Sequence, residues 1–232
     1  AASRVPGIYN LGGDLSLFML LIKTRDRAAL LNYGKLCIDN IHPCINNYFC
    51  PGLTTLSLVQ GDALGGGFET ALASDVLIAE ESATMGLPEI LFNLFPGMGA
   101  YNLLARRIGM NAAEKLILCG ELFSAKKLHE MGVVDVLAPD GQGESVTHDW
   151  IRRNRKRRNG FQAVQAAKKI VQPITREDLD RIVELWLDAA LRLDEKDIRM
   201  MHRLVRSQSR RIENTQYANT VESDNMPIAA SA

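Results

Sequence analysis

The part of the chain best suited to chemistry lies between Val59 and Gly99. Three consecutive glycines, Gly65–Gly67, follow an apolar segment and precede a helix-like stretch that contains Glu69. A strand that ends in a glycine turn and opens a helix presents unpaired backbone N–H groups, and the helix dipole makes that end attractive to anions. Glycines also let a ligand approach the backbone closely. The pattern favours a site for an anion or a developing oxyanion.

A second glutamate, Glu89, follows in Leu87-Pro88-Glu89, shortly before the turn-forming stretch Phe95–Gly99. Two glutamates in apolar surroundings can act as a general acid/base pair. An ordinary role is open as well, because glycine turns before helices are common and a glutamate in the first turn merely complements the helix dipole. The stretch is not a Walker loop, since no Lys-Ser/Thr follows, and it lacks the G-x-G-x-x-G spacing.

Short strands and one helix must position these residues. Thr54–Gln60 and Asp75–Glu80 read as strands, with Gly61–Gly67 as a turn and Phe68–Ser74 as a helix between them. Val133–Ala138 reads as a further short strand. Because no two strands lie at hairpin distance, the order favours parallel pairing.

Most of the remaining chain reads as helix. Asp14, Ser124 and the pair Thr175 and Asp178 are candidate N-terminal caps. Residues 1–10 give no strand pattern, and His42–Gly52 reads as irregular. The expected helices are Leu15–Lys23, Asp26 to about Ile41, Tyr101–Ile108, Ala112–Cys119, Ala125–Met131, Phe161–Val171, Arg176–Leu191 and Glu195–Arg210.

The sequence is therefore mixed α/β at first and helical later, with a turn at Gly141–Gly143. We expect a catalytic core over residues 1–140, a helical region over 141–212 and a mobile tail over 213–232.

Composition excludes several classes of protein. The 232 residues hold 27 basic and 27 acidic side chains, which argues against nucleic-acid binding through bulk charge. No run of 18 apolar residues exists, so no membrane span is expected. The four cysteines lack the C-x2-C spacing of zinc sites and the four histidines are scattered, so we expect no metal site and a reducing, cytoplasmic location.

Three stretches resemble the crotonase (enoyl-CoA hydratase/isomerase) superfamily. They are QGDALGGGFE (Gln60–Glu69), GLPE with LFPGMG (Gly86–Gly99) and LCGELFSAKKLHEMGVVD (Leu118–Asp135). The resemblance covers about two thirds of the chain. It implies an α/β fold, a crotonase-like spiral of ββα units with a helical C-terminal region. The family has further strands before the NLGGDL motif (Asn10–Leu15), so we expect the core to lack its first strands.

Within the superfamily, NLGGDL, MGLPEILFNLFPGMGAY (Met85–Tyr101) and RLDEKDIRMMHRLVRSQSRR (Arg192–Arg211) resemble the diffusible signal factor synthase branch. That likeness implies synthesis of a cis-2-unsaturated fatty acid signal. A 3-hydroxyacyl thioester on acyl carrier protein would be dehydrated, and the thioester would be hydrolysed. The alternatives are a trans-enoyl-CoA hydratase/isomerase of fatty-acid metabolism and a non-catalytic interaction protein of the same fold.

The resemblance also implies roles for individual residues. Glu69 and Glu89 would be catalytic, although which transfers which proton does not follow from the sequence. The backbone N–H groups of Gly13 and Gly66 would form the oxyanion hole. The further substrate-binding residues would be Gly65, Gly67, Leu87, Phe95, Gly97 and Met98. No cofactor is expected beyond the acyl carrier protein or CoA that carries the acyl chain.

Two further features bear on partners and substrate. The basic run Arg152–Arg158 could attract an acidic acyl carrier protein or a CoA phosphate, could be a solvated linker, or, less in keeping with its lack of aromatics, could bind nucleic acid. By analogy with the family we expect a homo-oligomer, a trimer or hexamer; a sensor-kinase receiver domain is a further candidate partner. Seven apolar residues could line an acyl tunnel or belong to the core: Phe18, Met19, Leu91, Phe92, Leu94, Phe95 and Met98.

Overall fold

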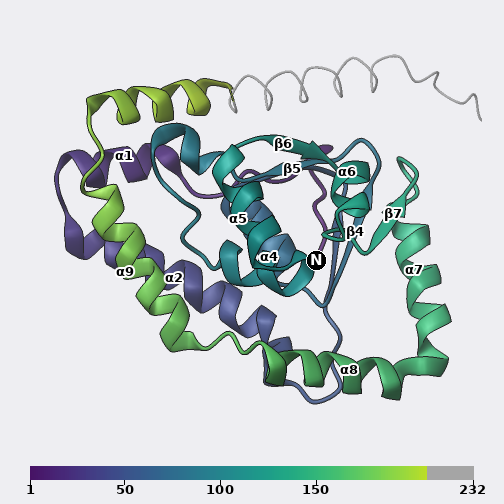
Figure 1. Ribbon diagram of the computed structural model, residues 1–232. Helices are drawn as coiled ribbons and strands as arrows, with labels where there is room; N and C mark the ends of the chain where they lie inside the picture. The colour runs from purple at the N-terminus through teal and green to yellow at the C-terminus, as the bar shows by residue number, and fades with distance from the viewer. Residues whose placement is uncertain (208–232) are drawn as a thin grey trace, which may run out of the picture.

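Two small sheets lie at the centre of the computed structural model, which describes residues 1–207 (Figure 1). One sheet has the order β1-β3-β5-β6, and the other has the order β2-β4-β7. Every pair is parallel except β5 with β6, which confirms the expected parallel arrangement. The strands are β1 (Gly7–Asn10), β2 (Leu56–Val59), β3 (Gly61–Leu64), β4 (Val76–Glu80), β5 (Thr84–Gly86), β6 (Leu122–Ser124) and β7 (Val136–Ala138).

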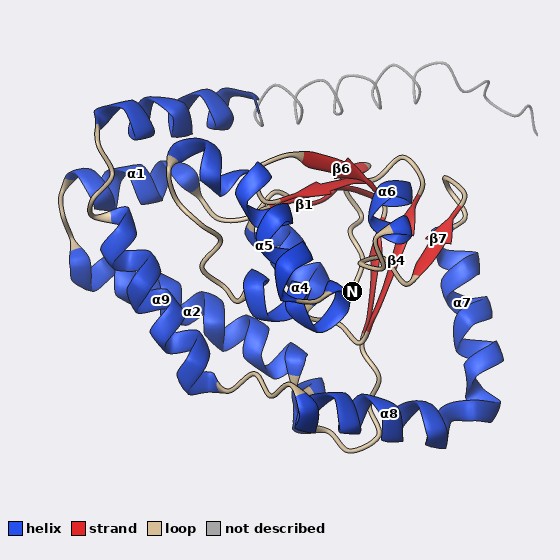
Figure 2. Cartoon of the chain, in the orientation of Figure 1, coloured by secondary structure: helices blue, strands red, loops and turns tan. Residues whose placement is uncertain are grey.

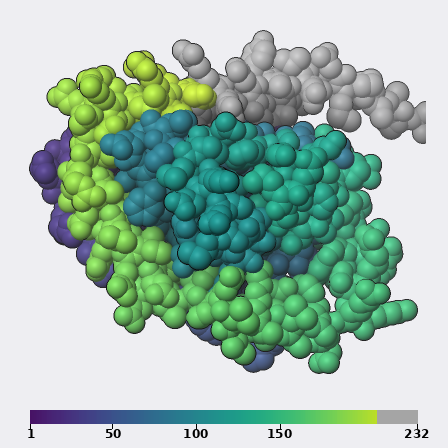
Figure 3. Space-filling model, viewed as in Figure 1, coloured from purple at the N-terminus to yellow at the C-terminus, as the bar shows by residue number. Residues whose placement is uncertain are grey.

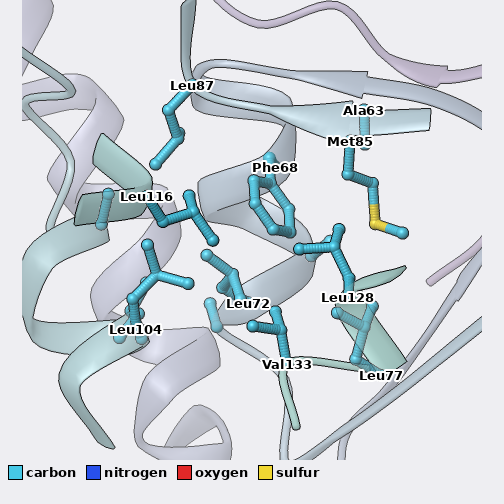
Figure 4. Close-up of a cluster of buried hydrophobic side chains, with 14 of the residues drawn as sticks. Ala63, Phe68, Leu72, Leu77, Met85, Leu87, Leu104, Leu116, Leu128 and Val133 are labelled. Atoms are coloured by element: carbon cyan, nitrogen blue, oxygen red, sulfur yellow. The ribbon is translucent and has the colours of Figure 1, made fainter. Parts of the chain in front are cut away.

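The main hydrophobic core lies between these sheets and the short helices that follow them. All five residues of β4 are buried, as expected for a parallel strand covered on both faces. Phe68 is fully buried and lies among Leu72, Leu77 and Leu116 (Figure 4). Phe68 belongs to α3 (Gly66–Leu72), so this packing fixes the helix that carries Glu69.

Short helices complete the chain around the sheets. They are α4 (Ala100–Ile108), α5 (Met110–Cys119), α6 (Ala125–Glu130), α7 (Gly143–Asn154), α8 (Arg158–Val171) and the 3-10 turns η1 (Asn47–Phe49), η2 (Pro88–Phe92) and η3 (Arg155–Arg157). The expected caps are confirmed: Asp14 and Ser124 accept backbone N–H groups of the helices that they open, and Thr175 and Asp178 form a reciprocal capping box.

A second group of helices lies beside the strands (Figure 2). It consists of α1 (Leu15–Lys23), α2 (Arg27–Ile45), α9 (Arg176–Ala190) and the helix over residues 195–207. The α2 and α9 helices run side by side, and an added Cβ on Gly34 would lie 2.5 Å from Cγ1 of Val183, so this glycine permits their close approach. Along one edge of the molecule the C-terminal helices pack against the N-terminal ones (Figure 3).

The structure corrects several expected elements. Gly61–Leu64 is a strand and not part of the turn, because Gly61 lets β1 approach so closely that a Cβ would meet the backbone of Gly7. Residues 7–10 form β1, the strand that pairs with β3, although their sequence shows no strand pattern. The second helix continues to Ile45, since Pro43 in its last turn removes only one hydrogen bond. The β5 and β6 strands and α7 were not expected as separate elements.

The mixed α/β class with a helical C-terminal region is confirmed. The division at residue 140 stays a prediction, and the tail over 213–232 lies outside the described residues, as does the end of the helix expected to reach Arg210. Among residues 1–207, no helix is both long and apolar enough to cross a membrane.

Candidate active site

A largely apolar cavity of about 80 Å³ lies between the sheets and the group of helices that contains α1, α2 and α9. The N-terminal part of the wall comes from the loop before α1, from α1 and α2, and from the end of β3 with the start of α3. The rest comes from η2 and the loop after it, from α9 and from the helix over residues 195–207. Segments almost two hundred residues apart therefore enclose one space. Both glutamates singled out in the sequence line it, together with Gly13 and Gly66.

Glu69 lies in the first turn of α3 and is only 1% exposed. Its Oε1 accepts hydrogen bonds from the backbone N–H groups of Met98, at 2.8 Å, and Ala100, at 2.9 Å. Burial raises the pKa of Glu69 to about 7, although these two donors act in the opposite direction. The carboxylate form thus has partners within the protein, and its titration lies near neutral pH.

Glu89 lies in the first turn of η2 and faces the same cavity. Its Oε2 is buried and has no hydrogen-bond partner within residues 1–207. Burial, and after it the negative charge of Glu69, raises the pKa of Glu89 to about 8. The other oxygen lies against Gly65, where an added Cβ would be 2.5 Å from Oε1 and where φ is +53°. A side chain at position 65 would therefore displace the Glu89 carboxyl.

Two glycines of the cavity wall, Gly13 and Gly66, lie at the N-terminal ends of helices. Gly66 is the first residue of α3, so its N–H has no helical carbonyl to bind. Gly13 immediately precedes Asp14, the N-cap of α1. The backbone at Gly12 has φ of +89°, and an added Cβ there would lie 3.1 Å from the nitrogen of Gly66. Glycine at position 12 is what lets the loop and the start of α3 come together.

The other residues predicted to contact substrate divide into two groups. Gly65, Gly97 and Met98 line the cavity. Gly67, Leu87 and Phe95 are not among the residues that line it, so their contact with substrate stays a prediction. An added Cβ on Gly67 would strike the backbone of β1, and Leu87 is fully buried in the main core (Figure 4). Phe95 packs against a second apolar cluster, which includes Met19, Leu30, Trp186 and Leu187.

The expected tunnel residues divide similarly. Phe18, Phe92, Leu94 and Met98 line the cavity. Met19 is buried in the second cluster, and Leu91 is 47% exposed; neither belongs to the wall.

Several wall residues were not singled out in the sequence as contacts. Tyr33 and Cys37 project from α2, Val183 and Trp186 from α9, and Leu204 from the helix over residues 195–207. The spacing of Tyr33 and Cys37, one helical turn apart, indicates a shared face. Nothing in the α9 sequence distinguishes a cavity wall from an ordinary core.

The basic run extends from the end of α7 through η3 into α8, and its charged side chains are all exposed. Arg152 pairs with Asp149 at 2.8 Å, and Arg158 donates to the carbonyl of Gly52 at 3.0 Å. The run is a positive surface separate from the cavity wall. In the described part of the chain, no cluster of three or more His, Cys, Asp or Glu residues is placed to hold a metal ion.

Known proteins resemble this chain in sequence and in fold. Residues 46–217 match the family model "Enoyl-CoA hydratase/isomerase". Human mitochondrial methylglutaconyl-CoA hydratase is 34% identical over 144 residues, which are 62% of this chain and 40% of that protein. The 2,3-dehydroadipyl-CoA hydratase of Escherichia coli K12 is 34% identical over 119 residues, 50% of this chain and 45% of the relative. The match thus spans less than half the length of these two relatives.

Solved structures show the same fold. Enoyl-CoA hydratase from Bacillus halodurans aligns with a TM-score of 0.67 at 21% identity, over 87% of this chain and 79% of that one. At this identity the likeness concerns the fold alone. The family model, by contrast, matches about three quarters of the sequence and includes both glutamates and the glycine turn. This chain belongs to the enoyl-CoA hydratase/isomerase family.

Proposed function

We propose that the chain adds and removes water across the Cα–Cβ bond of a 2-enoyl or 3-hydroxyacyl thioester, as a hydratase or dehydratase. One observation carries the proposal. Two carboxyl groups with pKa values near neutrality face one apolar cavity that is also lined by Gly13 and Gly66, at the starts of two helices. General acid–base catalysis is most efficient when the catalytic pKa lies near the working pH. Backbone donors at such a site suit an enolate oxygen.

The surroundings of the two carboxyls support an assignment of the resting proton. Two backbone donors stabilise the ionised form of Glu69, whereas Oε2 of Glu89 has no donor in the described chain. Like charges so close also disfavour ionisation of both groups. The pair therefore holds one proton near pH 7.5, with Glu69 ionised and Glu89 neutral.

From this resting state, hydration uses both glutamates, one as base and one as acid. Glu69 takes a proton from water, and the resulting hydroxide oxygen forms the bond to Cβ. The electron pair of the Cα–Cβ double bond moves towards the thioester carbonyl, whose oxygen accepts hydrogen bonds from the N–H groups of Gly13 and Gly66. Glu89 donates its proton to Cα, and a proton passes from Glu69 to Glu89 to restore the resting pair. Dehydration is the reverse sequence.

The test replaces each carboxyl by an amide. Glu69→Gln and Glu89→Gln should each lower the turnover of crotonyl-CoA and 2-decenoyl-CoA by about 10²–10⁴, the usual cost of losing a general acid or base. Glu80→Gln is the matched control, because Glu80 is 6% exposed but accepts a hydrogen bond from the Gly143 N–H away from the cavity. Near-normal turnover in either cavity variant would remove that residue from the mechanism.

A second candidate is the diffusible signal factor synthase reaction. It rests on the helix over residues 195–207, part of the stretch that resembles that branch. This helix supplies Leu204 to the cavity wall and buries Ile198 and Met201. In this reaction a 3-hydroxyacyl group on acyl carrier protein loses water to give a cis-2-enoyl group. Water then attacks the thioester carbonyl and the carrier thiol leaves. The exposed basic run would hold the acidic carrier.

Product analysis separates the two candidates. We would incubate the protein with 3-hydroxydecanoyl acyl carrier protein and identify the products by mass spectrometry and chromatography against cis and trans standards. A free cis-2-enoic acid supports the synthase reaction. A trans-2-enoyl thioester alone supports the hydratase. No turnover of any thioester would favour a non-catalytic member of the family that binds a partner such as a receiver domain. Light scattering in the same preparation tests the proposed trimer or hexamer.

A further inference from the structure

The side chain of Tyr33 places a hydroxyl group beside one of the two backbone donors. Tyr33 projects from α2 into the cavity wall. Its Oη accepts a hydrogen bond from the N–H of Asp14 at 3.3 Å, and an added Cβ on Gly13 would lie 3.4 Å from it. The hydroxyl is therefore adjacent to the loop that carries the Gly13 N–H.

The hydrogen bonds of this hydroxyl are incomplete. A tyrosine O–H can donate one hydrogen bond and accept others. The Asp14 N–H uses its acceptor capacity, and within residues 1–207 no acceptor for its proton is present. A polar group in a largely apolar cavity normally finds a partner. The missing acceptor is thus expected from a molecule that occupies the cavity.

The tyrosine ring is held in place by aromatic neighbours. Phe18 packs edge-to-face against it, with ring centroids 4.7 Å apart and an angle of 76° between the planes. Phe18 in turn contacts Trp186 at 5.2 Å. Burial raises the pKa of the Tyr33 phenol, so it keeps its proton over the pH range in which the glutamates titrate. Tyr33 is consequently a fixed donor and not a proton carrier.

We propose that the Tyr33 hydroxyl donates a hydrogen bond to the thioester carbonyl oxygen, as a third donor beside the N–H groups of Gly13 and Gly66. The inference rests on the proposed function, because it needs a thioester in the cavity. The three donors come from α2, the loop before α1 and the start of α3. Donors held in a water-poor site act most strongly on the charge that develops in the transition state. Tyr33 then contributes mainly to turnover and little to ground-state binding.

The test is Tyr33→Phe, which removes the oxygen and keeps the ring that packs against Phe18. We expect kcat for crotonyl-CoA hydration to fall about 10- to 100-fold, with KM within about threefold of the parent value. Tyr9→Phe is the matched control, because its hydroxyl bonds Ser57 at 3.2 Å and lies outside the cavity wall. An unchanged kcat, or a rise in KM alone, would overturn the proposal.

A second readout does not depend on turnover. In Glu69→Gln protein, the C=O stretching frequency of bound crotonyl-CoA, measured by isotope-edited infrared spectroscopy, reports how strongly the carbonyl is polarised. Adding Tyr33→Phe should move that frequency back towards the value in water, and no movement would contradict the inference. If Tyr33→Phe folds poorly, 3-fluorotyrosine at position 33 keeps the ring, makes the phenol a stronger donor and should lower the frequency further.

The two proposals can fail separately. If Glu69→Gln loses activity while Tyr33→Phe keeps it, the third donor is refuted and the hydratase assignment stands. If the parent protein turns over no enoyl or 3-hydroxyacyl thioester and shifts no carbonyl frequency, the proposed function itself is refuted.

Discussion

The two cavity glutamates predict a bell-shaped dependence of activity on pH. Activity requires exactly one proton on the pair, because one carboxyl acts as base and the other as acid. Burial raises the pKa of Glu69 to about 7 and that of Glu89 to about 8. Turnover should therefore be highest midway between these values, near pH 7.5, and should fall on both sides.

The size of the effect follows from those two values. With pKa values of about 7 and 8 for the two carboxyls, about 60% of the protein molecules hold a single proton on the pair at the optimum. The fraction is about 3% at pH 5.5 or pH 9.5. The rate should thus drop about 20-fold at either extreme, with a limiting slope of tenfold per pH unit. Hydration and dehydration should share one profile, since each reaction starts with one proton on the pair and only its position differs.

The assay follows the loss of the conjugated absorbance of crotonyl-CoA at saturating and at low concentration between pH 5 and 10. Circular dichroism at each pH ensures that a loss of rate is not a loss of fold. A profile that stays nearly flat down to pH 5 would refute the reasoning, because it would place both titrations near the ordinary glutamate pKa of about 4.5. In Glu89→Gln protein the residual activity should keep only its acidic limb, because Glu69 alone then titrates.

Three other predictions concern stability and need only thermal or urea unfolding. The pKa of Glu89 is raised above its unfolded value, so its stabilising effect is complete at low pH and is lost as pH rises towards 8; Glu89→Gln should therefore melt higher than the parent protein at pH 9 and at nearly the same temperature at pH 4. Arg107→Met should lower the free energy of unfolding by about 2–4 kcal/mol, because the Arg107 side chain is 5% exposed and binds two carbonyls and a carboxylate. A decrease of less than about 0.5 kcal/mol would contradict this. Gly67→Ala should lose at least about 1–3 kcal/mol by clashing with the Asn10 backbone, whereas Gly160→Ala, in open space on α8, should gain about 0.5–1 kcal/mol; equal effects would show that the packing argument fails.

The sequence predicted the part of the site that is local in the chain. Glycines that open a helix and a glutamate one turn later determine each other's positions through backbone geometry, so Gly66 and Glu69 could be placed without knowledge of the fold. The Asp14, Ser124 and Thr175 caps were predictable for the same reason. Each depends on hydrogen bonds within four residues.

The opposite wall of the cavity could not be predicted, because it depends on contacts between distant segments. Trp186 and Leu204 look like any apolar residue of an amphipathic helix. Only the packing of α9 against α2 turns Trp186 towards the cavity, and only the docking of the helix over residues 195–207 brings Leu204 there. Leu87 was assigned to the substrate for its place beside a motif, yet its side chain turns into the main core. The β3 strand was missed because Gly61, which reads as a turn residue, serves there to admit a neighbouring strand.

The position of Trp186 makes the cavity wall an optical probe. The chain has two tryptophans. Trp186 is 7% exposed and lies against Phe18 and Gly97, while Trp150 lies in α7 beside Phe161, away from the cavity wall. Replacing Trp150 by phenylalanine would leave a single indole emitter, so its emission wavelength and lifetime would report both the docking of α9 and the arrival of an acyl group, without a label or a coupled enzyme.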